Sequence, residues 1–117
     1  MRPDRKPSSE ELRDRFGRNL RECRRRAGIS QYELALRAEV SLPAISLFEL
    51  GRSLPRTDTF LRLAGSLGVS PSELVAGVQW MPAETVMTPG GFEVPENPEL
   101  AAEVAELRGT VPGRRRG

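Results

Sequence analysis

Three Ser-x-x-Glu sequences in the first 77 residues stand at possible helix starts, at Ser8 to Glu11, Ser30 to Glu33 and Ser70 to Glu73. At a helix start the serine side chain can accept a hydrogen bond from a backbone N–H, and the glutamate can reach back to the N–H of the serine. Each copy stands at the head of a segment with helical spacing of apolar residues. The pattern therefore predicts several short helices with brief connections.

Five helices are expected between residues 9 and 77. The first covers 9–27, where apolar residues recur every three or four positions from Leu12 to Ala27 and Gly28 stops the helix. The next three are expected at 31–38, between Ser41 and Gly51, and at 57–67, and a short fifth begins after Ser70. Helices joined this briefly must pack across one another, so residues 9–77 are predicted to form a compact all-α domain.

The pattern changes after Gly77. The segments "VQWMP" and "GGFEV" alternate like two strands joined by "AETVMTPG", so 78–94 is expected to be a β-hairpin or a dimerisation segment, with Trp80 and Phe92 in a small satellite core or a dimer interface. A short helix is expected at 98–108 within a flexible tail of 95–117, and residues 1–8 are expected to form a flexible arm.

Composition excludes several classes of function. The chain has one cysteine, Cys23, and no histidine, so it has no internal disulfide and no Cys/His cluster for zinc. The sequence has no phosphate-binding glycine loop and no nucleophile–base pair. No apolar run approaches the roughly 18 residues of a membrane span. We expect a protein without enzymatic activity, metal, cofactor or membrane contact.

The charge is unevenly distributed, although the net charge is only +2. Residues 1–30 carry ten Arg or Lys against five Asp or Glu, residues 31–76 carry four against five, and residues 77–117 carry four against six. Seventeen of the 18 basic residues are Arg, the side chain better suited to bidentate contacts with phosphate. The basic excess therefore lies at the N-terminal end.

The segments 31–38 and 41–51 have the residues of a helix-turn-helix. A small residue stands where the two helices nearly touch, an apolar residue fills the turn, and two apolar residues anchor the second helix: Ala35, Val40, Ile45 and Phe48. Together with "GISQ" and "LRLAGSLGVSPSEL", this text resembles the lambda-repressor and Cro (XRE) type of helix-turn-helix regulator over residues 12–77. The segment from "AGVQW" to "GGFEV" looks, more loosely, like the ends of small actinobacterial members.

The resemblance implies a five-helix lambda-repressor-like domain that places the helix after Ser41 in the major groove of double-stranded DNA. Since Ile45 and Phe48 face inward, the outer face and the base-contacting positions of the family fall on Ser41, Leu42, Pro43, Ala44, Ser46 and Leu47. Phosphate contacts are implied at Gln31, Arg37, Arg52, Ser53 and Arg56. A structural ion pair is implied between Arg24 and Glu49.

Two features depart from that family pattern. Base-contacting positions in the family often hold amide or basic side chains, but here Ser46, with Ser41 at the edge, supplies the only side-chain hydrogen-bonding groups. We expect Leu42, Ala44 and Leu47 to meet thymine methyl groups, with DNA shape and dimer symmetry adding specificity. The second departure is Glu39, at a turn position where Gly is usual, and a left-handed backbone there costs about 1 kcal/mol.

The leading hypothesis is a sequence-specific transcriptional regulator, a repressor that binds DNA as a homodimer in the bacterial cytoplasm, associated with the nucleoid. One alternative is an antitoxin that represses its own operon and binds a toxin as protein partner through residues 78–117. The other is a protein-interaction adaptor that retains the fold and uses Leu42 and Leu47 as its contact surface.

Overall fold

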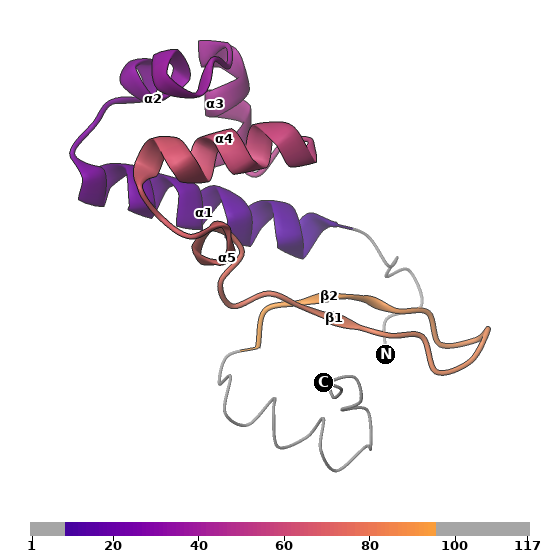
Figure 1. The fold of residues 1–117 in the computed structure, drawn as a ribbon. Coiled ribbons are helices and arrows are strands. Elements are labelled where there is room, and N and C mark those ends of the chain that lie inside the picture. Colours follow the sequence, from indigo (N-terminus) through magenta and orange to yellow (C-terminus); the bar gives the residue numbers. More distant parts are fainter. Residues whose placement is uncertain (1–8, 96–117) are drawn as a thin grey trace.

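The structure is a computed structural model and describes residues 9–95 (Figure 1). Its elements are α1 (Glu10–Ala27), α2 (Gln31–Ala38), α3 (Leu42–Glu49), α4 (Thr57–Leu67), α5 (Pro71–Leu74), β1 (Gln79–Met81) and β2 (Gly91–Glu93). The prediction of a mostly helical fold with five helices and a small hairpin is confirmed. The expected arm at 1–8, the helix at 98–108 and the rest of the tail from residue 96 lie outside the described residues.

Serine side chains cap three of the helices. Ser30 accepts a hydrogen bond from the Glu33 N–H, and Ser41 accepts one from the Ala44 N–H. Ser70 instead bonds the N–H of Ser72, one residue earlier than a capping box requires. The first helix begins after Ser9, whose side chain makes no capping bond, while the expected cap Ser8 lies outside the described residues.

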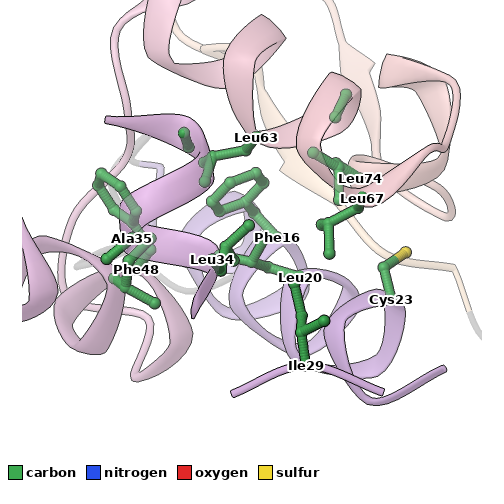
Figure 2. Packing of buried hydrophobic residues seen from close by; sticks show 13 residues of the cluster. Phe16, Leu20, Cys23, Ile29, Leu34, Ala35, Phe48, Leu63, Leu67 and Leu74 are labelled. Carbon is green, nitrogen blue, oxygen red and sulfur yellow. The ribbon is translucent and has the colours of Figure 1, made fainter. Parts of the chain in front are cut away.

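A single apolar core joins all five helices (Figure 2). Phe16 and Leu20 of α1 are almost fully buried, and the ring of Phe16 lies edge-on to Phe48 of α3, with ring centroids 6.2 Å apart. Cys23 is also buried in this core. Ala27, which the spacing placed on the same stripe, is exposed at the last position of α1.

Helices α1 and α3 approach closely at Gly17. A Cβ atom at this position would lie 2.5 Å from the carbonyl oxygen of Phe48 and 2.9 Å from that of Glu49. Both distances are shorter than real Cβ contacts, so only glycine permits this packing. The contact fixes the C-terminal end of α3 directly on the backbone of α1.

The two strands form an antiparallel hairpin in which Trp80 is opposite Phe92. Their rings meet edge to face with centroids 5.1 Å apart. Strand β2 contacts α1, and Figure 1 shows the hairpin on the far side of α1 from α2 and α3. The hairpin is therefore attached to the helical domain at a distance from the helix-turn-helix. Within residues 9–95, no helix has the length and apolar character needed to cross a membrane.

Candidate nucleic-acid interface

The turn between α2 and α3 has the geometry that the sequence predicts. Glu39 adopts φ 59° and ψ 49°, the left-handed conformation that glycine adopts most easily. Its N–H bonds the carbonyl oxygen of Leu36, and the next N–H, of Val40, bonds that of Ala35 at 3.0 Å. Ala35 is buried and Val40 packs against the core, so the turn is held on its inner side.

The exposed face of α3 is mainly apolar. Leu42 and Leu47 keep 42% and 43% of their surface exposed, and Ser41 and Pro43 are exposed beside them. Ile45 and Phe48 are buried, as the division into two faces requires. Ala44 differs from the prediction, since it is half-buried and packs against the core. It lies one turn before Phe48 and therefore on the same side of the helix.

Ser46 is also less available than the sequence suggests. Its hydroxyl donates a hydrogen bond to Oε1 of Gln31 at 3.2 Å, and the amide Nε2 of Gln31 donates to Oε1 of Glu49 at 2.9 Å. Two residues that were assigned to different roles, a base contact and a phosphate contact, therefore bond each other. These hydrogen bonds hold the N-terminus of α2 against α3.

Glu49 is the centre of this network and is only 5% exposed. Its carboxylate accepts hydrogen bonds from Nε and Nη2 of Arg24 at 2.6 and 3.0 Å, so the implied ion pair is present and bidentate. The hydrogen bond to Glu49 raises the pKa of the Arg24 guanidinium above its ordinary value. Arg24 also donates to the carbonyl oxygen of Ile29, and thus joins α1, the following loop and α3.

The arginines expected to contact phosphate differ in whether they are paired with a carboxylate of the protein. Arg56 makes a bidentate contact with Asp58 at 3.0 and 3.3 Å, and this contact lowers the pKa of the Asp58 carboxyl to about 2. Arg37 pairs with Glu33 at 2.6 Å on the surface of α2. Arg52 is exposed, and its side chain makes no hydrogen bond or ion pair with another residue of 9–95.

Ser53 is half-buried in the connection between α3 and α4, so it lies near Arg52 but is less accessible. Of the three arginines expected to contact phosphate, only Arg52 is therefore without a carboxylate partner among the described residues. No group of three or more metal-ligating side chains is present in this part of the chain.

Two contributors to the site were missed from the sequence. Arg62 of α4 donates to the carbonyl oxygen of Ala38 at 2.8 Å and so caps the end of α2 beside the turn. No sequence signal indicates this bond, since it depends on how α4 crosses α2. Leu50 is 62% exposed at the end of α3, and its position three residues after Leu47 could have placed it on the same face.

The sequence comparisons agree with this geometry. A helix-turn-helix family profile matches residues 20–74. The chain is 30% identical over 105 residues to the HTH-type transcriptional regulator DdrOP3 of Deinococcus deserti, a match that covers 80% of this chain and 81% of that protein. It is 36% identical over 75 residues to the uncharacterized HTH-type transcriptional regulator y4dJ of Sinorhizobium fredii, covering 64% of this chain and 97% of the relative.

The solved structures include a similar repressor. The P22 c2 repressor, whose crystal structure contains a synthetic operator, is 32% identical, with a TM-score of 0.51 over 53% of this chain and 94% of the repressor chain. Two helices joined by a tight turn, with the second exposing one face, define a helix-turn-helix domain of lambda-repressor-like fold. The chain belongs to the XRE-type helix-turn-helix family of DNA-binding transcriptional regulators, which are not enzymes.

Proposed function

We propose that the chain is a sequence-specific repressor that acts as a homodimer on the bacterial nucleoid and inserts α3 into the major groove. The observation that carries the proposal is the exposed face of α3, held in place by the Glu49 network beneath it. A rigid helix with one exposed face is what base recognition in the major groove requires.

Recognition by this face depends on apolar contacts. Leu42 and Leu47 present methyl groups that match the C5-methyl group of thymine, the apolar feature of the major groove. Ser46 contributes by fixing Gln31, whose second amide N–H can face a phosphate at the N-terminus of α2. We therefore expect operators with thymines placed opposite α3 and with few guanine-specific contacts.

A dimer is proposed because one recognition helix covers only a few base pairs, and two half-sites about 34 Å apart gain both affinity and specificity. The hairpin is our choice of dimer contact. Trp80 remains 51% exposed despite its contact with Phe92, and Val86 in the connecting loop is 98% exposed. In sedimentation of the full chain, Val86→Glu with Met87→Glu should give monomers, whereas Leu61→Glu, on exposed α4 surface, should leave the dimer intact.

The main experiment is selection of bound duplexes from a random-sequence library with the full chain. The proposal expects a two-fold symmetric, thymine-containing consensus whose binding weakens as salt rises. Recovery of no consensus, with equal binding of all duplexes, would reject sequence-specific repression.

The same selection also bears on two other hypotheses about the function. The adaptor hypothesis is favoured by the exposed leucines at 42, 47 and 50, and it predicts no DNA binding at all. The antitoxin hypothesis predicts the same DNA binding together with a protein partner at residues 78–117. Copurification of one stoichiometric partner whose binding is lost on truncation at residue 77 would support it.

A further inference from the structure

The arginines of the structure differ in whether they have internal partners. Arg24, Arg26, Arg37, Arg56 and Arg62 form ion pairs with carboxylates. By contrast, the side chains of Arg18 and Arg25 are exposed and make no hydrogen bond or ion pair with another residue in the described range 9–95. Both lie on α1, which sequence reasoning did not assign to DNA contact.

Arg18 and Arg25 share one face of α1 with Arg21, because the spacings of three and four residues place all three on one side of the helix. This face borders α3. The guanidinium Nη2 of Arg21 donates a hydrogen bond of 3.4 Å to the carbonyl oxygen of Glu49, which is its one side-chain hydrogen bond or ion pair within the described part. We call Arg18, Arg21 and Arg25 the α1 arginine face.

Arg52 lies in the loop that reaches this side of α1. A Cβ atom added to Gly51 would lie 2.6 Å from Oδ1 of Asp14, so the loop after α3 rests on α1 one turn before Arg18. Asp14 lies on the same side of α1 one turn before Arg18, and Glu22 lies one turn after Arg18. Within residues 9–95 no ion pair connects either carboxylate to these arginines. Within the described residues, none of these four arginines forms an ion pair with a carboxylate, and Arg21 among them contacts the C-terminal end of α3.

We propose that the α1 arginine face binds the phosphates of the DNA strand that borders the groove entered by α3. The proposal rests on the proposed DNA-binding function and assigns some of the phosphate contacts to α1. A guanidinium without an internal partner can bind phosphate bidentately without first losing an ion pair. Arg37 and Arg56 would have to give up a carboxylate to make the same contact.

The test uses the full chain with Arg18→Gln and Arg25→Gln, singly and together. Arg26→Gln is the matched control, because it removes the same charge from the same helix on the side that faces Glu73 of α5. Binding is measured by fluorescence anisotropy against a salt series. The two probes are a labelled duplex carrying the consensus selected by the wild-type chain and a scrambled duplex of equal length.

Each lost phosphate contact should reduce the slope of log K against log salt by about 0.9, and the double variant should lose about 1.8. Both duplexes should weaken by the same factor, because phosphate contacts carry no base information. Arg26→Gln should retain the wild-type slope. The charge-preserving pair Arg18→Lys and Arg25→Lys should also retain it, which separates loss of charge from damage to the fold.

The proposal is overturned if the double Gln variant shows the same slope as Arg26→Gln while the wild type binds DNA. A wild-type chain that binds neither duplex at any salt concentration overturns the proposed function itself, and the α1 contact with it. Loss of slope in the double Lys variant as well would assign the effect to altered structure and would also overturn the proposal.

Discussion

Ser46 and Gln31 are hydrogen-bonded across the helix-turn-helix, with the Ser46 hydroxyl 3.2 Å from Oε1 of Gln31. The bond makes Ser46 a support for the neighbouring helix rather than a free group at the DNA surface. Ser46→Ala should therefore lower the free energy of unfolding by about 1 kcal/mol, the value of one ordinary hydrogen bond. It should weaken binding to all duplexes alike and leave the preferred site unchanged, as a repeat of the duplex selection would show. A changed consensus would instead identify Ser46 as a base contact.

Glu49→Gln keeps the shape of the buried side chain and removes its charge. Arg24 then loses its ionic partner in a site where Glu49 is only 5% exposed, so the unfolding free energy should fall by about 3 kcal/mol. Glu33→Gln is the control, since it breaks the exposed pair with Arg37 and should cost less than about 0.5 kcal/mol. Urea denaturation of both variants measures the difference, and equal losses would contradict a central role for the Glu49 network.

Gly17→Ala should destabilise the domain although alanine is the better helix former. The added Cβ atom would lie 2.5 Å from the Phe48 carbonyl oxygen, and such overpacking costs about 1–3 kcal/mol. Gly65→Ala in α4 is the opposite case, because nothing lies within 4 Å of its added Cβ and the helix should gain about 1 kcal/mol. Thermal melts should therefore move in opposite directions. A stabilised Gly17→Ala variant would show that α3 is not seated on α1 as described.

Asp58→Asn should release Arg56 for phosphate contact. The ion pair lowers the pKa of the Asp58 carboxyl to about 2, so above that pH the ionised carboxylate competes with phosphate for Arg56. We expect the variant to bind DNA more tightly and with a steeper salt dependence, by about 0.9 in the slope for one added contact. Adding Arg56→Gln to Asp58→Asn should abolish the increase in slope. A gain that survives in the double variant would come from the removed negative charge alone.

Much of the fold was predictable because its signals are local. Serine caps, glycine stops and apolar spacing placed α2 and α4 at the bounds that the structure has, and the alternation around Trp80 and Phe92 indicated the hairpin. The left-handed turn at Glu39 was also expected, since the family usually has glycine there.

The details of the site were less predictable because they depend on how distant segments cross. Helical periodicity gave the outer face of α3, but it did not show that Ala44 packs on the core or that Ser46 bonds Gln31. The partners of the arginines were equally hidden. Arg56 and Arg18 have the same chemistry, yet only the structure shows that, within residues 9–95, Arg56 pairs with Asp58 and Arg18 pairs with no carboxylate.

Replacing each thymine of the selected site by uracil tests whether the apolar face of α3 binds thymine methyl groups. Uracil lacks only the C5-methyl group, whose burial contributes about 0.8 kcal/mol, or about fourfold in affinity. We expect such a loss at one or more positions for the wild-type chain. In the Leu47→Ala variant, we expect no loss at the position that faces residue 47. If no uracil substitution weakens binding, the apolar face does not recognise the operator in this way.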